Sequence, residues 1–188
     1  MNIPNTITIF RIVLIPVFIA VFFMPQPWAP ALATFIFWFA AITDWFDGYL
    51  ARKLEQQSDF GAFIDPLADK LMVTSALLLI VWRHPESYWI LFSALIILAR
   101  EIFVPSLREW MSALGKGDVV AVSFFGKAKT TGQMFALLFL IYEADLFGLP
   151  TFIFGEGLLV WAAILTVVSM LDYIRSAWDT LAEKTAAQ

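Results

Sequence analysis

A pair of aspartates near the end of an apolar segment is the first feature of this chain suited to chemistry. In the stretch TDWFDGYLAR, residues 43–52, Asp44 and Asp47 lie three residues apart. A helix would place them on one stripe with Gly48 and Ala51, whose small side chains let a bulky group approach the carboxylates. Ionisable residues inside an apolar segment are costly, so their default interpretation is functional.

A second pair of aspartates follows in the next apolar segment. Asp65 and Asp69 are four residues apart, and Gly61 precedes Asp65 by four, which again makes one helical stripe. The short connection KLEQQSD indicates that the two helices are antiparallel neighbours. At 1.5 Å rise per residue the four carboxylates lie about 7–13 Å in from the adjoining helix ends, so they can meet at one level.

Four carboxylates at close quarters need a counter-charge, which a divalent cation supplies. Oxygen ligands alone, with no Cys in the chain and one His in a distant loop, indicate Mg²⁺ or Mn²⁺ rather than zinc. Four acids suffice for two ions, and a two-metal site suits displacement at phosphorus, because the ions hold the attacking and the leaving oxygens. Two other interpretations are ordinary pairing of the acids with arginines and an ion-conducting path, as in a divalent-cation transporter.

The composition predicts that these acids belong to a membrane protein. Of 188 residues 61% are hydrophobic, against about 45–50% in soluble domains, and the mean hydropathy is +0.79. We predict one all-α integral membrane domain over residues 1–188, with a short N-terminal interfacial segment and an active site in the cytoplasmic half. Breaks rich in Pro and Gly divide it into six transmembrane helices at about 8–24, 29–53, 60–82, 87–113, 124–142 and 151–178. The net charge of −4 argues against nucleic acid as a partner.

The distribution of Lys and Arg predicts the orientation of these helices. If the N-terminus is cytoplasmic, every one of the 12 basic residues except Arg83 falls on the cytoplasmic side or in the adjoining helix ends. Six spans then return the C-terminus to the cytoplasm. The N-terminus lacks the charged region and the cleavage site of a signal peptide, so the first span is expected to stay in the mature protein.

The two acidic stretches also resemble a known family. The segment DWFDGYLAR, eight further residues and the segment GAFIDPLAD are similar, at every fixed position, to the signature of the CDP-alcohol phosphatidyltransferases. Three other segments, NIPNTITIFRIVLIPVF at residues 2–18, AREIFVPSLREWM at 99–111 and GKAKTT at 126–131, resemble the bacterial phosphatidylglycerophosphate synthases of that family. The resemblance covers the chain from Met1 to about Met134.

This resemblance implies a homodimeric enzyme of the bacterial inner membrane, with membrane lipids around it. The enzyme would transfer the phosphatidyl group of CDP-diacylglycerol to the sn-1 hydroxyl of glycerol 3-phosphate and release CMP. Carried over by position, the metal ligands are Asp44, Asp47, Asp65 and Asp69, and Asp69 is also the general base. The positions implied to line the CDP pocket are Gly48, Ala51, Arg52 and Gly61.

Basic residues on the fourth and fifth predicted spans suit the phosphate of an acceptor. Arg108 and Lys129 lie about 7 Å in from their helix ends, level with the shallower acids, whereas Arg100 lies about 20 Å in. We therefore rank Arg108 and Lys129 before Arg100, and Lys127 last. This cluster favours a phosphorylated acceptor over serine, but inositol phosphate and, with the same chemistry, phosphatidylglycerol stay open as alternatives. Glu101 is expected to balance a nearby arginine.

Polar residues near the N-terminus have two interpretations. Asn5, Thr8 and Arg11 could border the nucleotide site, or they could form an interfacial cap at the start of the first span.

Overall fold

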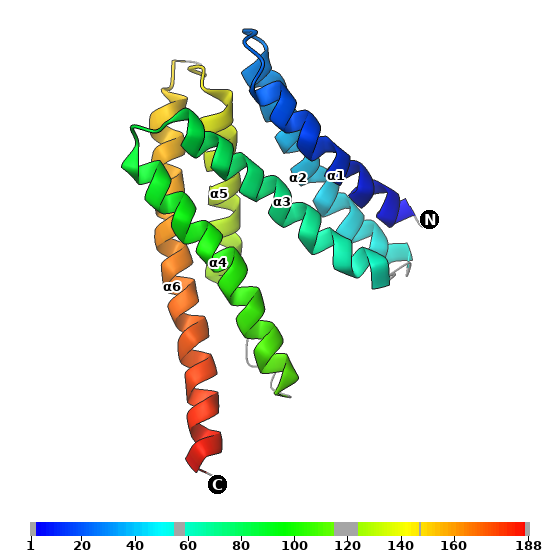
Figure 1. Cartoon of the computed structure of the whole chain (residues 1–188), viewed down its shortest axis with the longest axis vertical. Coiled ribbons are helices and arrows are strands. Elements are labelled where there is room, and N and C mark those ends of the chain that lie inside the picture. The colour runs from blue at the N-terminus through cyan, green and yellow to red at the C-terminus, as the bar shows by residue number, and fades with distance from the viewer. Residues whose placement is uncertain (1–2, 55–58, 115–123, 147, 187–188) are drawn as a thin grey trace. The chain divides into compact units, whose positions relative to one another are not determined.

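The chain is helical throughout the part that its structure describes. The computed structural model describes residues 3–54, 59–114, 124–146 and 148–186, and the only β pairing within these ranges is an isolated bridge between Leu146 and Leu149. The helices are α1 (Ile3–Phe22), α2 (Ala29–Leu54), α3 (Asp59–Arg83), α4 (Tyr88–Ala113), α5 (Phe124–Tyr142) and α6 (Thr151–Ala186) (Figure 1). The predicted all-α class is confirmed.

The observed helix bounds follow the predicted ones within one or two residues, except at the two ends of the chain. Helix α1 already begins at Ile3, and α6 continues to Ala186. Pro4 fits in the first turn of α1, where a backbone N–H has no partner within the helix. Beyond residue 178 the sequence is polar but rich in good helix formers, so the helix outlasts the apolar segment.

Two helices of the described ranges are long and apolar enough to cross a membrane. They are Tyr88–Ala113 and the Thr151–Arg175 part of α6, while Thr6–Phe22 and Ala29–Thr43 are shorter apolar helices. The prediction of six spans, like that of one domain, stays a prediction.

The helices form two packed units. The first comprises Met1–His84 and Leu137–Gly155, and the second comprises Pro85–Ala136 and Glu156–Gln188. Helices α5 and α6 therefore each contribute to both units.

In the first unit α1 packs against α2 and α3, and α2 packs against α3. Buried residues recur every three or four positions along α1 and include Thr8, Arg11, Ile15, Phe18 and Phe22. Phe18 contacts Phe37 of α2 with ring centroids 6.0 Å apart. Figure 1 shows the N-terminal end of α1 at the same end of this unit as the last turns of α2 and the first turns of α3. The polar part of the α1 face therefore lies at the end that carries the predicted acids.

At its opposite end the first unit is tied together by Arg83. The guanidinium donates to Oε2 of Glu143 over 2.8 Å and to the carbonyl oxygen of Phe22 over 2.7 Å. It also lies 4.2 Å from the centre of the Phe22 ring, within cation–π range. Glu143 has φ +61°, a left-handed conformation that costs free energy for a residue other than Gly. Arg83 thus joins the ends of α1 and α3 to the strained residue that follows α5.

In the second unit α4 begins at a conventional cap. The Ser87 hydroxyl accepts a hydrogen bond from the backbone N–H of Ile90 over 3.2 Å and donates to Glu156 of α6. Close packing joins α5 to α6, because a Cβ atom on Gly132 would lie only 2.5 Å from the Trp161 ring.

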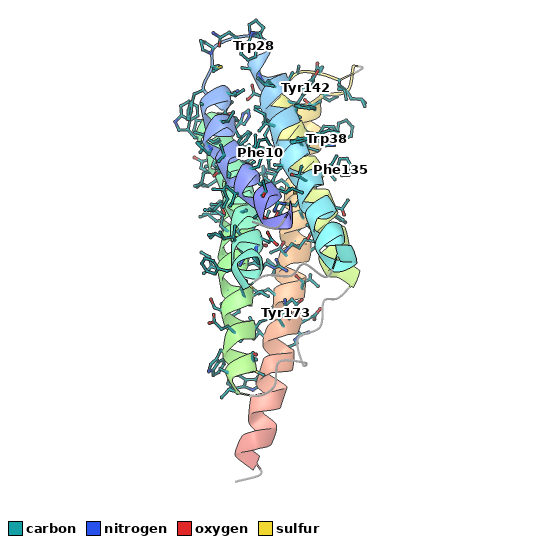
Figure 2. The ribbon with its side chains drawn as sticks, turned by 90° about the vertical axis from the view of Figure 1, so that its right-hand side faces the viewer. Phe10, Trp28, Trp38, Phe135, Tyr142 and Tyr173 are labelled. Atoms are coloured by element: carbon teal, nitrogen blue, oxygen red, sulfur yellow. The ribbon has the colours of Figure 1, made fainter. Side chains whose placement is uncertain are left out.

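Large apolar side chains cover much of the surface of each unit. Phe10, Trp28 and Trp38 of the first unit and Phe135 of the second are each about half exposed. Figure 2 shows Trp28 at the connection between α1 and α2, and the other three along the helices. Exposed apolar surface on this scale marks a protein that contacts lipid rather than water alone.

Candidate active site

The last turns of α2 hold the first half of the predicted acidic site. Asp44, Asp47, Gly48, Ala51 and Arg52 all lie within the helical range Ala29–Leu54. A continuous helix keeps the predicted spacing of the two acids, three residues apart on one stripe. The side chains of these five residues lie outside the described part of the chain, so the predictions for them stay predictions.

The first turns of α3 hold the second half of this site. Gly61 is buried, the Asp65 side chain is half-buried and Asp69 is exposed, and the three are spaced by four along one helix. The buried face of α3 continues through Ala68 and Met72. Asp65 therefore lies at the edge of the packed face of α3, while Asp69 points away from it.

Helix α1 contributes a polar group to the same place. The Thr8 hydroxyl donates a hydrogen bond to Oδ1 of Asp65. Thr8 and Arg11, one turn apart, are each only 1% exposed. The sequence offered two interpretations for Thr8 and Arg11, and the contact with Asp65 favours the one that puts them beside the site. Their spacing from the apolar residues of the buried α1 face was the signal in the sequence, because it places both on that face.

The donor set of α3 fits a hard divalent cation. Asp65 and Asp69 offer only oxygen atoms, which Mg²⁺ and Mn²⁺ prefer, and the hydroxyl bonded to Asp65 is the kind of outer contact that orients a metal-binding carboxylate. No group of three or more His, Cys, Asp or Glu side chains that could hold a metal is present among the residues described. The side chains of Asp44 and Asp47, which would complete the set, lie outside the described part of the chain.

A compact charged cluster lies in the second unit, on α4 and α5. Arg100 donates to Oε1 of Glu101 over 2.6 Å, and Nζ of Lys129 lies 3.9 Å from the same oxygen. Lys129 is 1% exposed, and its Nζ has no hydrogen-bond acceptor among the residues that the structure describes. Glu101 balances Arg100, as the sequence predicted. The sequence did not predict that one Glu101 oxygen also lies beside Lys129.

Two further residues were predicted for the acceptor site, Arg108 and Lys127. Arg108 lies eight residues after Arg100 on α4 and is exposed. The side chain of Lys127 lies outside the described residues. Of the predicted phosphate-binding cations, the structure therefore brings Arg100 and Lys129 together.

An apolar groove of about 500 Å³ runs along α2 in the first unit. Its walls include Phe35 and Trp38 of α2 and Phe139 and Tyr142 of α5, and Figure 2 labels Trp38 and Tyr142. Asp44 lies six residues after Trp38, which is about 9 Å along the helix. The sequence alone does not predict this groove, because it depends on which faces of two distant helices meet.

Comparison with known proteins identifies the family. The family model described as CDP-alcohol phosphatidyltransferase matches residues 1–169. The chain belongs to this family. The CDP-alcohol phosphatidyltransferase match includes both acidic stretches and the charged cluster of α4 and α5.

Relatives within the CDP-alcohol phosphatidyltransferase family cover almost the whole chain. A protein of Yersinia enterocolitica is 49% identical over 184 residues, which are 97% of this chain and 98% of the relative. A protein of Salmonella typhimurium is 46% identical over 183 residues, with the same coverage. Both are named CDP-diacylglycerol–glycerol-3-phosphate 3-phosphatidyltransferase.

Proposed function

We propose that this protein transfers the phosphatidyl group of CDP-diacylglycerol to the sn-1 hydroxyl of glycerol 3-phosphate, giving phosphatidylglycerophosphate and CMP. The observation that carries the proposal is the sequence identity of 49%, over 97% of the chain, with a relative named for this reaction. The four aspartates of the two acidic stretches support it, because carboxylates at this spacing suit displacement at phosphorus.

In this proposal the four aspartates Asp44, Asp47, Asp65 and Asp69 hold two Mg²⁺ or Mn²⁺ ions. The bound ions would neutralise charge that develops on the transferring phosphate. Arg52, one turn after Gly48, would hold the pyrophosphate of the CDP group through bidentate hydrogen bonds from its guanidinium. Gly48, Ala51 and Gly61 would line the CDP pocket, because their small side chains let the nucleotide approach closely.

Asp69 is proposed to act as the general base. Its carboxylate accepts the proton of the acceptor hydroxyl while that oxygen forms a bond to the phosphorus that carries diacylglycerol. The bond from this phosphorus to the oxygen of CMP breaks, and CMP leaves with the bonding electrons. The exposure of Asp69, one turn beyond the half-buried Asp65, supports this role, since the base must reach a substrate.

The charged cluster of α4 and α5 is proposed to receive the phosphate of the acceptor. Arg100 and Lys129 share one Glu101 oxygen, which leaves one net positive charge. A buried ammonium without a hydrogen-bond acceptor among the described residues is costly in a protein and suits an anionic substrate. Arg108, which is exposed on α4, would add a second net positive charge.

The membrane setting is part of the proposal. Six spans in the bacterial inner membrane, with both termini in the cytoplasm, would place the acids at the face where soluble glycerol 3-phosphate arrives. The apolar groove beside Trp38 supports a lipid substrate, since acyl chains attached at the level of the acids would extend along α2. As the family resemblance implies, the working form is proposed to be a homodimer.

The test is CMP release by purified protein in detergent with CDP-diacylglycerol and Mg²⁺, adding one acceptor at a time. We expect CMP with glycerol 3-phosphate, and loss of CMP in Asp69→Asn or after removal of divalent ions with EDTA. Release of CMP with inositol phosphate, serine or phosphatidylglycerol, but not with glycerol 3-phosphate, would support the same transfer reaction. It would refute glycerol 3-phosphate as the acceptor. Folded protein that binds divalent ions but releases no CMP with any acceptor would refute the enzyme and favour a cation transporter.

A further inference from the structure

The hydroxyl of Thr8 differs from the helical hydroxyls of Thr34, Thr166 and Ser106 by its acceptor. Ser and Thr side chains inside helices commonly bond to a carbonyl of the preceding turn. Thr34 does so to Pro30 over 2.8 Å, Thr166 to Ala162 over 2.7 Å and Ser106 to Ile102 over 2.9 Å. Thr8 donates to a carboxylate on another helix, 57 residues along the chain.

The contact constrains Asp65 in two ways. A carboxylate has about four lone-pair positions, and the Thr8 hydroxyl occupies one on Oδ1. The rotation of the carboxylate is thereby fixed against α1, which is packed on α3, and Oδ2 is held in one direction. Thr8 is 1% exposed, so water does not compete for the bond.

We infer that Thr8 is a positioning residue for the divalent-cation site: its hydroxyl holds the Asp65 carboxylate in the orientation that binds the ion. The inference deepens the proposed function and rests on the metal site named there. It makes α1 part of the cation site, although this helix has no carboxylate. Removing such an outer contact commonly weakens metal binding or activity about 10- to 100-fold.

The experiment compares Thr8→Val, which keeps the shape and removes the hydroxyl, with Thr8→Ser, which keeps the hydroxyl. Thr166→Val is the matched control, since Thr166 is equally buried but bonds only within its own helix as far as the described contacts go. Mn²⁺ binding to the full-length, substrate-free protein in detergent is measured by the spin-resonance signal of free Mn²⁺. The Mg²⁺ dependence of CMP release is measured in parallel.

We expect Thr8→Val to weaken Mn²⁺ binding about tenfold and to raise the Mg²⁺ concentration for half-maximal activity by a similar factor. Its kcat at saturating Mg²⁺ is expected to recover most of the wild-type value. Thr8→Ser and Thr166→Val are expected to stay within about twofold of wild type. Added to Asp65→Asn, Thr8→Val is expected to cause no further loss, because the two residues act through one contact.

Four results obtained with folded variants would overturn the inference. They are wild-type Mn²⁺ binding in Thr8→Val, equal weakening in Thr8→Ser, equal weakening in Thr166→Val, and a higher KM for CDP-diacylglycerol with unchanged Mn²⁺ binding. Thermal unfolding in EDTA checks folding, and Thr8→Ala serves if Val does not fit. Loss of folded protein in both hydroxyl-free variants would assign the hydroxyl a structural role instead. A wild-type protein that binds no Mn²⁺ would refute the metal site and the inference together, whereas a different acceptor would leave the inference standing.

Discussion

Replacement of Lys129 by Met is expected to stabilise the protein and to impair its use of glycerol 3-phosphate. The Lys129 ammonium is 1% exposed, lies 3.9 Å from the nearest carboxylate oxygen of Glu101 and has no hydrogen-bond acceptor within the described residues. Met fills a similar volume without the charge. Glu101 keeps its closer partner, Arg100, at 2.6 Å, so the substitution does not leave a carboxylate unpaired.

The size of both effects follows from this geometry. Replacing a whole buried ion pair by apolar side chains is neutral or stabilises proteins by about 1–4 kcal/mol. We expect the same range for Lys129→Met, because Glu101 keeps Arg100 as its partner. For a chain of this length each kcal/mol raises Tm by about 2–4 °C. A hydrogen bond from a cation to phosphate contributes about 1.5–3 kcal/mol. Since 1.4 kcal/mol is a factor of ten, kcat/KM for glycerol 3-phosphate is expected to fall about 10- to 100-fold.

Two assays in detergent test this expectation. Thermal unfolding is followed with and without glycerol 3-phosphate, which at 100 times its Kd should stabilise the wild-type protein by about 2.7 kcal/mol and Lys129→Met by less. CMP release gives kcat/KM for each substrate, and Arg175→Met, which removes an exposed cation of α6, serves as control. Unchanged kcat/KM for glycerol 3-phosphate would refute the role of Lys129 in the acceptor site. A lower Tm would show that the attraction to Glu101 outweighs the cost of burial.

Two further substitutions test the packing inside each unit, one in the first unit and one in the second. Arg83→Gln removes the 2.8 Å ion pair with Glu143, and we expect a loss of about 1.5–3 kcal/mol in thermal unfolding with the KM of both substrates unchanged; a changed KM would contradict a purely structural role. Gly132→Ala puts a Cβ atom 2.5 Å from the Trp161 ring and is expected to destabilise by about 1 kcal/mol, because the half-exposed ring must shift. Gly157→Ala, with open space around it, is the control and is expected to stabilise by up to about 1 kcal/mol.

Local signals in the sequence predict where the helices begin and end, but they do not predict which helices contact one another. The predicted span 124–142 is the observed α5, and 87–113 differs from α4 by one residue, because Pro, Gly and polar breaks end helices by local rules. Periodicity also places Thr8 on the inner face of α1, but it does not say that this face meets Asp65, 57 residues away. The same limit applies to Glu101, whose neighbour Arg100 was predicted while its approach to Lys129 was not.

The partners of buried polar groups separate structural from functional candidates in this chain. Thr166 and Ser169 are buried, yet each donates a hydrogen bond to a carbonyl of its own helix. That bond offsets the free-energy cost of burying the hydroxyl. Thr8 and Lys129 are buried to the same degree, but Thr8 donates to an acid of another helix, and Lys129 has only a distant carboxylate among the described residues. Burial of a charge without a hydrogen bond, as at the Lys129 ammonium, lowers stability unless a ligand supplies the missing acceptor. The substitutions Thr166→Val and Lys129→Met together test this distinction. Thr166→Val removes a hydroxyl that bonds within its own helix and should change kcat/KM little for either substrate. Lys129→Met removes a cation that depends on a ligand and should lower kcat/KM mainly for glycerol 3-phosphate.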